Sequence, residues 1–340
     1  MRARKRIMDK FSALTLSEVC ENLKTSKNTL VLFHSRPDAD AIGSAFSLKL
    51  ILEAMGSEVY CICEQEIPGR LAFLTDGLQR SVVLRSLDRS FEFERCITVD
   101  TASPSQLGEL YPLFEDKLDL MIDHHENGIP YADNYIVKDS AATGEIIFEI
   151  ANELTRTGAL DKIPQRVYEL IYAAISSDTG CFKYSNVTER THTCAAELIK
   201  QGIDVADINY RLFDCKSEKL LAAEAAGFQN IKFYSGGKIA AVIFPYELKQ
   251  KLELLDEHLE TLVDVARSIE GVKVAYAVRQ YTPDRVYRIS IRSSCSVDVA
   301  SVASVFGGGG HVKAAGCTIE ADSPLFAAGL LAEEIEKRLL

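Results

Sequence analysis

Short apolar segments alternate with segments of helical periodicity along the first half of the chain, and this alternation limits the possible folds more than any other feature. Residues 29–33 (TLVLF) form an unbroken, β-rich apolar run, which is typical of a strand buried inside a parallel sheet. A helical pattern follows over 42–55, and Gly56 stands where a helix C-cap is expected. The same order then recurs, with strands predicted over 57–62, 81–84, 96–100 and 118–123 and helices over 141–154 and 164–176. This alternation predicts an α/β fold, an open parallel sheet with helices on both faces.

The pattern changes after about residue 188. Three helical segments come first, predicted over 191–200, 205–213 and 217–226. Hairpin-like strands follow, over 228–234 and 239–244 around a Gly-Gly turn and over 273–281 and 285–292 around a Thr-Pro-Asp turn. We therefore predict three parts, a sheet domain over 1–190, a helical connector over 191–226, and a smaller α/β domain over 227–340.

Composition excludes several classes of protein. Hydrophobic residues make up 47% of the 340 and charged residues 26%, as in soluble globular proteins and unlike disordered or fibrous ones. No apolar run approaches the ~18 residues that a membrane span needs. The basic N-terminus, residues 1–10, is not followed by the apolar stretch of a signal peptide. The nine cysteines include no C-x-x-C pair, so we expect reduced thiols and a cytoplasmic protein.

The charge of the chain narrows the class of partner. The net charge of −11 argues against binding to long duplex DNA, which normally requires a basic surface. The charge is uneven, however, because residues 271–319 carry six basic residues against two acidic ones, a net charge of +4. An acidic protein with one basic segment favours a small phosphorylated ligand.

Residues that commonly bind metals follow the predicted strands. In an open α/β sheet, ligands bind at the carboxyl ends of the strands. Four segments bring such residues to that edge, namely His34 with Asp38 and Asp40, then Asp100, then Asp123 with His124 and His125, and Asp178 at the end of a predicted helix. Each segment alone has a simpler explanation, since Asp38 or Asp40 could cap the following helix and Asp100 could cap a turn. Four such segments at one edge together predict a metal site.

The donor types favour hard divalent cations. A carboxylate-rich set with two or three imidazoles and no thiolate suits Mn²⁺ or Mg²⁺ better than a closed zinc site. Two such ions lie ~3.5–4 Å apart, share a bridging carboxylate, activate a water molecule and hold phosphoryl oxygens. Cys181 is the thiol nearest to these segments, and we expect it to pack in the core.

A glycine run near the end of the chain favours an anion site. Gly307 to Gly310 precede His311, and residues without Cβ let backbone N–H groups approach a phosphate closely. A flexible linker is the alternative, but a predicted helix (299–306) and strand (315–319) bracket the run. Arg292 ends a predicted strand and can bind phosphate through two nitrogens. The predicted substrate-binding residues are therefore Arg292, Gly308, Gly309, Gly310 and His311, whereas Arg279, Arg285 and Arg288 are better explained as a solvated face.

Six motifs carry a resemblance to a known family. HSRPDADAIGS, VDTA, MIDHHENG and SSDTGCF, in this order, resemble motifs I to IV of the DHH phosphoesterase superfamily. RISIRSS and FGGGGHVKAAG resemble its DHH-associated C-terminal domain, so the resemblance covers roughly residues 30–319. It implies a doubly wound parallel sheet joined by helices to a smaller mixed α/β domain, with the active-site cleft between them. Catalysis is expected in 1–190 and substrate binding in 227–340.

The resemblance also implies two metal ions, with Mn²⁺ preferred and Mg²⁺ as the alternative. Carried over residue by residue, the ligands of one ion are His34, Asp38 and Asp100, and those of the other are Asp40, Asp100, His124 and Asp178. Catalytic roles are expected for the bridging Asp100, for His125 and for Asp123. His125 would contact the scissile phosphate or help to protonate the leaving oxygen, and Asp123 would orient His124.

The function that the resemblance implies is that of the compact nanoRNase type. Such a metal-dependent hydrolase releases mononucleotides from very short oligoribonucleotides, and we expect it also to convert 3′-phosphoadenosine 5′-phosphate (pAp) to AMP. The alternative is a phosphodiesterase for linear or cyclic di-AMP. An inorganic pyrophosphatase would carry a different C-terminal signature, and a nucleotide-binding module without turnover would not need Asp100. The expected partners are short oligoribonucleotides or small phosphorylated nucleotides. We expect no association with a membrane, and a homodimer is a further possibility.

Overall fold

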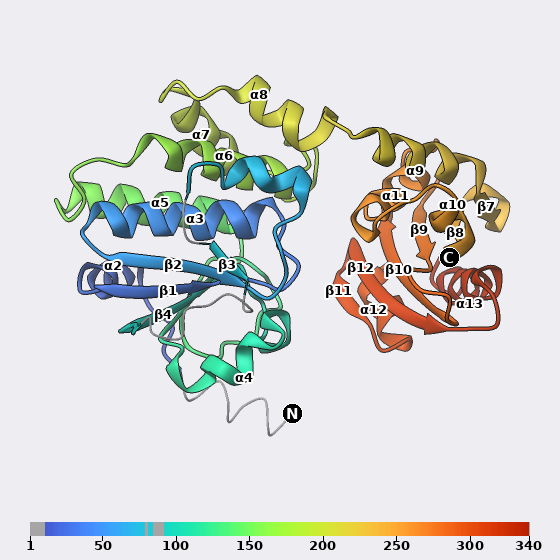
Figure 1. Ribbon diagram of the computed structural model, residues 1–340, viewed down its shortest axis with the longest axis horizontal. Helices are drawn as coiled ribbons and strands as arrows, with labels where there is room; N and C mark the ends of the chain where they lie inside the picture. Colours follow the sequence, from blue (N-terminus) through green and yellow to red (C-terminus); the bar gives the residue numbers. More distant parts are fainter. Residues whose placement is uncertain (1–10, 79–80, 84–91, 340) are drawn as a thin grey trace. The chain divides into compact units, whose positions relative to one another are not determined.

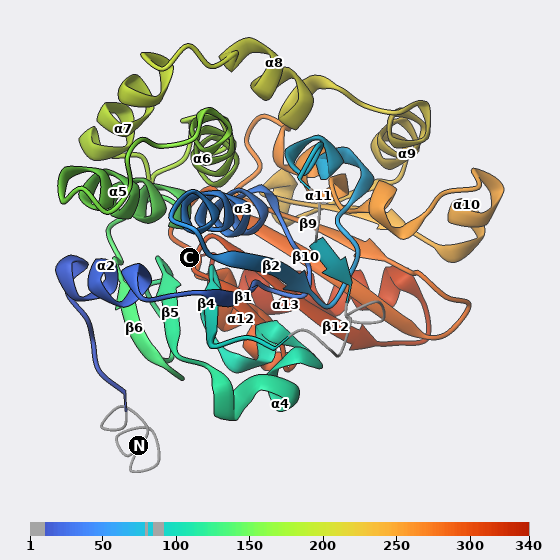
Figure 2. The same ribbon diagram turned by 60° about the vertical axis from the view of Figure 1, so that its left-hand side comes forward.

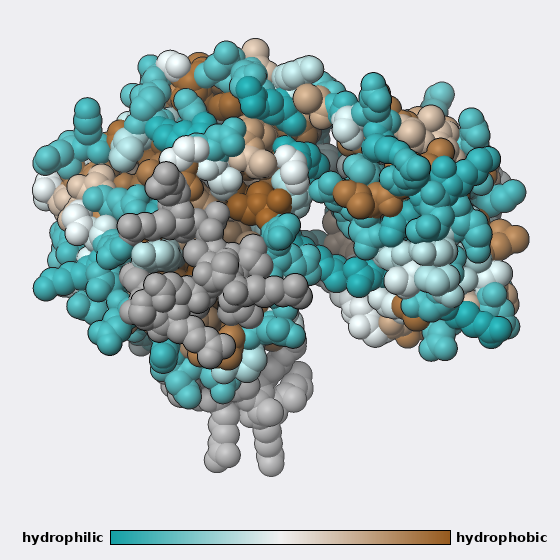
Figure 3. Space-filling model, viewed as in Figure 1, coloured by the Kyte–Doolittle hydropathy of each residue, from teal (hydrophilic) through white to brown (hydrophobic). Residues whose placement is uncertain are grey.

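The computed structural model describes residues 11–78, 81–83 and 92–339, which fall into two compact units, Met1–Cys215 and Lys216–Leu340 (Figure 1). Leu84, the last residue of one predicted strand, and the basic residues 1–10 lie outside the described residues. No helix among the described residues is long and apolar enough to cross a membrane. The face of the C-terminal unit seen in Figure 3 is mostly hydrophilic, with scattered hydrophobic side chains.

The N-terminal unit is built on a parallel sheet. In the described residues its strands are β1 (Asn28–Leu32), β2 (Glu58–Cys63), β3 (Ser81–Val83), β4 (Arg95–Val99), β5 (Leu120–Asp123) and β6 (Asp133–Ile136). They lie in the order β3-β2-β1-β4-β5-β6, and every neighbouring pair is parallel. This is the order of a doubly wound sheet, in which the winding direction reverses between β1 and β4. The doubly wound fold is thus confirmed.

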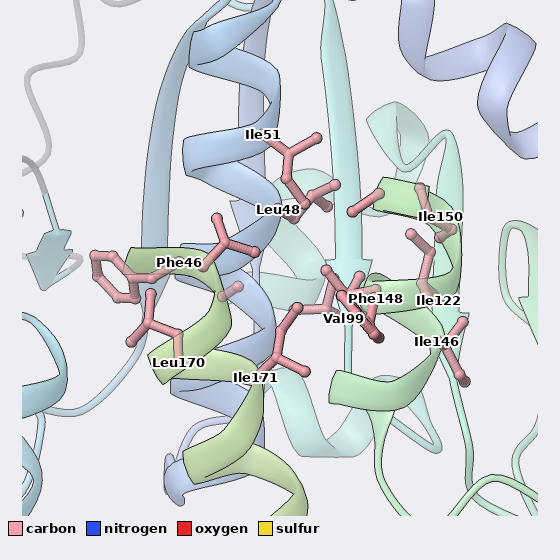
Figure 4. Close-up of a cluster of buried hydrophobic side chains, with 14 of the residues drawn as sticks. Phe46, Leu48, Ile51, Val99, Ile122, Ile146, Phe148, Ile150, Leu170 and Ile171 are labelled. Carbon is pink, nitrogen blue, oxygen red and sulfur yellow. The ribbon is translucent and has the colours of Figure 1, made fainter. Parts of the chain in front are cut away.

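Helices cover both faces of this sheet (Figure 2). They are α2 (Leu16–Lys24), α3 (Ala39–Ala54), α4 (Leu110–Phe114), α5 (Thr143–Arg156), α6 (Gln165–Asp178), α7 (Glu189–Ile199) and α8 (Val205–Asn209). Helices α3, α5 and α6 bury Leu48, Ile146 and Ile171 against Val99 and Ile122 of the sheet (Figure 4). Full burial of one such side chain stabilises the fold by roughly 1.5–3 kcal/mol. Helix α4 packs on the opposite face, where its own apolar residues meet those of β1 and β5.

Close helix packing depends on two glycines. A Cβ atom at Gly43 of α3 would lie 2.5 Å from the carbonyl oxygen of Leu170 in α6. A Cβ atom at Gly144 of α5 would lie 2.7 Å from the Cβ atom of Ala174, also in α6. Any larger residue at either position would force the helices apart, because real Cβ atoms do not approach so closely. Helices α3, α5 and α6 are therefore closely packed.

The C-terminal unit is a mixed α/β domain, as the resemblance implies. Its described strands are β7 (Ile231–Tyr234), β8 (Ile239–Phe244), β9 (Val274–Arg279), β10 (Val286–Ser293), β11 (Gly309–His311) and β12 (Ala314–Glu320), in the order β11-β12-β10-β9-β8-β7. The β8–β9 pair is parallel and the other pairs are antiparallel. The helices are α9 (Glu218–Gln229), α10 (Tyr246–Lys251), α11 (Leu262–Arg267), α12 (Val299–Val305) and α13 (Pro324–Glu336). Apolar residues of α12 and α13 pack on one sheet face and those of α9 and α11 on the other.

The residues predicted as a separate helical connector are divided between the two units. Helices α7 and α8 pack on α6, and their Leu198 and Ile208 are buried in the core of the N-terminal unit. Helix α9 instead packs on α11 in the C-terminal unit. The structural division therefore falls after Cys215, within the range 191–226. The assignment of catalysis to one domain and substrate binding to the other stays a prediction.

Candidate functional site

The predicted metal-binding residues lie at the carboxyl ends of the central strands. His34 follows β1, and Asp100 follows β4. Asp123 is the last residue of β5, and His124 and His125 come directly after it. Since the winding reverses between β1 and β4, this edge of the sheet is where a doubly wound fold leaves room for a ligand.

The structure gathers these side chains into overlapping groups. The groups of metal-type ligands among the described residues are His34 with Asp38 and Asp100, Asp40 with His124 and Asp178, and Asp100 with His124 and His125. Within each group the ligand atoms lie within 4.8 Å of one another. Cysteines of the described residues are absent from these groups, and Cys181, predicted to be core packing, is only half-buried.

Asp100 lies between the first two groups. Its Oδ2 atom is 3.5 Å from Nε2 of His34, and its Oδ1 atom is 3.6 Å from Nε2 of His124. On the far sides, Nε2 of His34 is 3.7 Å from Oδ1 of Asp38, and Nε2 of His124 is 3.3 Å from Oδ2 of Asp178. The two oxygens of one carboxylate thus face different groups, an arrangement in which one carboxylate can bridge two ions.

The two adjacent histidines are oriented by different partners. Nδ1 of His124 is 3.2 Å from the carbonyl oxygen of Ser140, whereas Nδ1 of His125 is 2.7 Å from Oδ1 of Asp123. The prediction that Asp123 orients His124 is therefore wrong, because it orients His125.

Backbone N–H groups hold two of the carboxylates, Asp38 and Asp40. Asp38 is the N-cap of α3, and its Oδ1 accepts hydrogen bonds from the N–H groups of Asp40 and Ala41, so the simpler N-cap interpretation of Asp38 also holds. Asp40 is fully buried and accepts hydrogen bonds at 2.7 and 2.9 Å from the N–H groups of Thr143 and Gly144, in the first turn of α5. The positive end of a helix dipole favours a carboxylate in this position.

Burial and crowding disfavour the charged forms of two of the carboxylates, Asp40 and Asp178, whereas the neighbouring histidines lower the pKa of Asp100. Burial, reinforced by the negative charge of Asp100, raises the pKa of Asp40 to about 7. Burial and the charge of Asp40 raise the pKa of Asp178 well above its usual range. A divalent cation would compensate this repulsion, and carboxylate oxygens with imidazole nitrogens are suitable ligands for Mn²⁺ or Mg²⁺. The residues present therefore fit a metal centre.

The last two glycines of the run in the C-terminal unit belong to a strand, so the run is not a flexible linker. Gly309, Gly310 and His311 make up β11, which pairs with β12 at the edge of the sheet. A Cβ atom at Gly308 would lie 2.2 Å from the carbonyl oxygen of Gly316, and one at Gly310 would lie 2.5 Å from that of Ala314. Two of the four glycines are thus required by the close approach of β12, whereas a Cβ atom at Gly309 would meet nothing within 4 Å.

Arg292 and His311 are brought to the same sheet face. In the strand register, Ala314 is the partner of Arg292 on one side and of His311 on the other. Register partners point to the same face, so a small side chain separates the two larger ones. His311 is exposed, and Arg292 is half-buried.

The prediction that Arg279 lies on a solvated face is wrong. The residue is 5% exposed and pairs with Glu260 at 2.7 Å. Its guanidinium also donates a hydrogen bond to Ser290. Arg285 does lie in solvent, where it pairs with Asp322.

Three residues that contact the candidate ligands were not among the predicted site residues. The Ser140 carbonyl contacts His124, and the Gly144 N–H group contacts Asp40. Thr143 donates its hydroxyl hydrogen to Oδ1 of Asp100 at 3.0 Å. A Ser-x-x-Thr-Gly sequence before a helix indicates a helix start, and that signal alone does not mark them as part of a site.

Comparison with known proteins identifies two family models in this chain. The DHH family, N-terminal domain, matches residues 28–175, and the DHHA1 domain matches residues 238–337. A solved structure described as an exopolyphosphatase-related protein from Bacteroides fragilis has a TM-score of 0.86 and 23% identity, over 95% of each chain. At that identity the likeness supports the fold.

Curated relatives match nearly the whole chain. One from Bacillus subtilis, named bifunctional oligoribonuclease and PAP phosphatase NrnA, is 30% identical over 86% of this chain and 90% of its own length. A relative of the same name from Thermus thermophilus is 28% identical over 89% of this chain and 87% of its own. A cyclic-di-AMP phosphodiesterase, PdeA, from Listeria monocytogenes is 24% identical over 88% of this chain but only 46% of its own length.

Proposed function

This chain belongs to the DHH family, and we propose from that premise that it is a metal-dependent hydrolase that cleaves very short oligoribonucleotides to mononucleotides and converts pAp to AMP. The relatives from Bacillus subtilis and Thermus thermophilus carry that pair of activities in their names and cover the same two domains. The observation that carries the proposal is the position of Asp100, whose two oxygens face separate groups of ligands.

We assign two divalent cations, Mn²⁺ by preference, to these groups. His34, Asp38 and Asp100 would hold one, and Asp40, Asp100, His124 and Asp178 would hold the other. The chemistry that two such ions supply is activation of a water molecule and neutralisation of charge on the phosphate oxygens. The protein contributes a fixed set of ligands, in which Asp38 and Asp40 are held by backbone N–H groups at helix N-termini.

His125 is suited to donate a proton to the leaving oxygen. Burial opposes the charged ring, but the hydrogen bond to Asp123 and the charge of Asp100 raise the pKa of His125. Because Oδ1 of Asp123 accepts the hydrogen bond of Nδ1, the nitrogen that exchanges a proton with substrate is Nε2. Asp123 thus orients the proton donor.

The C-terminal unit would bind the substrate at phosphates away from the scissile bond. Arg292 supplies a guanidinium, His311 lies on the same face, and Gly309 leaves the strand surface uncovered by a side chain. A basic segment of this limited size suits a mononucleotide or dinucleotide, and the net charge of −11 disfavours a long polyanion.

A panel of substrates tests the proposal. With Mn²⁺ present, rates would be measured on a labelled RNA dinucleotide, a long RNA strand, pAp, cyclic di-AMP and inorganic pyrophosphate. We expect the dinucleotide to be hydrolysed fastest, pAp to be hydrolysed, and pyrophosphate to be left intact. Pyrophosphate as the best substrate would overturn the proposed function.

A second candidate function is a phosphodiesterase for linear or cyclic di-AMP. The Listeria monocytogenes relative named for that activity aligns with 88% of this chain. Hydrolysis of cyclic di-AMP faster than of the RNA dinucleotide in the same panel would favour this second function.

A further inference from the structure

Glu145 is a buried carboxylate that the proposed mechanism does not use. It lies in the first turn of α5 and is 2% exposed. Its Oε2 atom accepts hydrogen bonds from the Ser140 hydroxyl at 2.7 Å and from the Ala141 N–H at 3.2 Å, and Nε of Arg190 lies 3.9 Å away. Burial of a carboxylate is costly unless it is paired and hydrogen-bonded, so these contacts require an explanation.

The segment that Glu145 holds is in contact with three of the proposed metal ligands. The Ser140 carbonyl faces Nδ1 of His124 at 3.2 Å. Thr143 contacts Asp100 through its hydroxyl and Asp40 through its N–H group. We call residues 140–144 the support segment. Residues 140–142 have the irregular backbone of a strand-to-helix connection, and Thr143 and Gly144 begin α5. The Glu145 side chain therefore adds two hydrogen bonds to a part of the chain that no regular strand or helix ladder holds.

We propose that Glu145 is a positioning residue, which fixes the support segment through Ser140 and Ala141 and thereby orients the His124 ring toward the metal centre. With the Ser140 carbonyl accepting a hydrogen bond from Nδ1, the proton of neutral His124 is on Nδ1 and the lone pair is on Nε2. That nitrogen faces Asp178 at 3.3 Å and Asp40 at 3.9 Å. A hydrogen bond at the other ring nitrogen is the usual means of orienting a metal-binding imidazole. This inference rests on the proposed metal centre.

The effect of Glu145 should be unequal between the two groups of ligands. Nδ1 of His124 contacts the support segment, whereas Nε2 of His34 contacts Asp38 and Asp100. Asp40 has an additional hydrogen bond from Ser44, in its own helix. Loss of Glu145 should therefore weaken the group of Asp40, His124 and Asp178 more than the group of His34 and Asp38.

The chain offers a rescue variant and a matched control. Glu145→Gln keeps an oxygen that can accept both hydrogen bonds from Ser140 and Ala141, whereas Glu145→Ala removes it. Glu149 lies one turn further along α5 and binds Arg190 and the Tyr135 hydroxyl, outside the support segment. Glu149→Gln therefore changes a carboxylate of the same helix that also faces Arg190, and it leaves the hydrogen bonds of Glu145 to Ser140 and Ala141 in place.

The first measurement uses metal-free, full-length protein. Long-range ¹H–¹⁵N correlation spectra, at a pH where the ring is neutral, report which nitrogen of His124 carries the proton. We expect a single Nδ1–H form in the wild type, Glu145→Gln and Glu149→Gln, and a mixture of tautomers in Glu145→Ala. A folded Glu145→Ala protein with the wild-type spectrum would overturn the proposal.

The second measurement is calorimetric titration with Mn²⁺. In Glu145→Ala we expect one of the two binding steps to weaken by about 10–100-fold, as for other groups that orient metal ligands. Glu145→Gln and Glu149→Gln should bind both ions as the wild type does, and equal weakening of both steps in Glu145→Ala would contradict the unequal role.

If Glu145→Ala does not fold, Glu145→Asp replaces it, since its shorter side chain keeps the charge but cannot reach Ser140. A wild type that binds no Mn²⁺ would overturn the proposed function, while the spectra would still decide the role of Glu145.

Discussion

The two units present charged residues in opposite ways. At the strand ends of the N-terminal unit, Asp40 and Asp100 are 0% and 2% exposed and are held by hydrogen bonds from α5. On the sheet of the C-terminal unit, His311 is exposed and Arg292 half-buried, beside a glycine whose surface is open. Buried charges are fixed in position when the chain folds, whereas exposed ones can form contacts that are released again. The first arrangement suits chemistry at a bond, and the second suits reversible binding.

Replacement of Asp100 should have the largest effect, because it removes the carboxylate between the two ligand groups. We expect Asp100→Ala to lower the rate of dinucleotide hydrolysis at least ~10²-fold, since water activation and charge neutralisation both depend on this residue. Calorimetry should show weakened binding of both ions. Asp116→Ala, at an exposed position of the same unit, is the control and should be unchanged. Activity near wild type in Asp100→Ala would mean that the site is elsewhere.

Replacement of Arg292 should affect binding rather than chemistry. A charge-assisted hydrogen bond to phosphate contributes about 1.5–3 kcal/mol, so we expect Arg292→Ala to weaken dinucleotide binding roughly 10–150-fold. A small ester such as bis-p-nitrophenyl phosphate has no distal phosphate and should be hydrolysed at the wild-type rate. Arg285→Ala, whose side chain is 71% exposed, is the control. Equal losses on both substrates would place Arg292 in the reaction centre and remove the contrast between the units.

The smallest expected effects are on stability, and they should differ between two neighbouring glycines of the run, Gly308 and Gly309. Gly308→Ala would drive a Cβ atom against the backbone of β12, so we expect it to lower the free energy of unfolding by ~1–3 kcal/mol. Gly309→Ala places its methyl group in open space and should change stability by less than about 0.5 kcal/mol. Urea denaturation of the two variants measures the difference. Equal stabilities would show that β11 does not pair with β12 as described.

The sequence predicted which side chains gather at this edge of the sheet, because the signal of each one is local. Asp100 follows β4 directly and His34 comes two residues after the end of β1, and parallel strands bring such positions to one edge whatever their distance along the chain. The partner of Asp123 could not be predicted in the same way. Whether Asp123 faces His124 or His125 depends on where β5 stops and how the backbone turns, and the residue types do not reveal either.

Two secondary-structure elements and one residue were not predicted from the sequence. Strand β6 (Asp133–Ile136) was not predicted, because only one of its four residues is buried and its pattern is neither alternating nor apolar. Helix α13 was also not predicted, although Ser323 and Pro324 are a typical N-cap and first residue. Glu145 gave no signal of its role, since its contacts with the support segment depend on tertiary structure and a glutamate in a first helical turn is ordinary.

The close contact of α3 and α5 with Ala174 of α6 has a consequence for metal exchange. Asp40 lies on α3, Asp178 ends α6, and Gly43 and Gly144 let these helices meet at a separation set by backbone atoms. A helix spacing set by backbone atoms does not change with side-chain rotamers, so the backbone that carries these proposed ligands is preorganised during folding, before an ion arrives. The rate at which an ion binds should then be limited by the loss of its bound water. An ion with an unsuitable radius should bind weakly, because the helix spacing does not change to fit it.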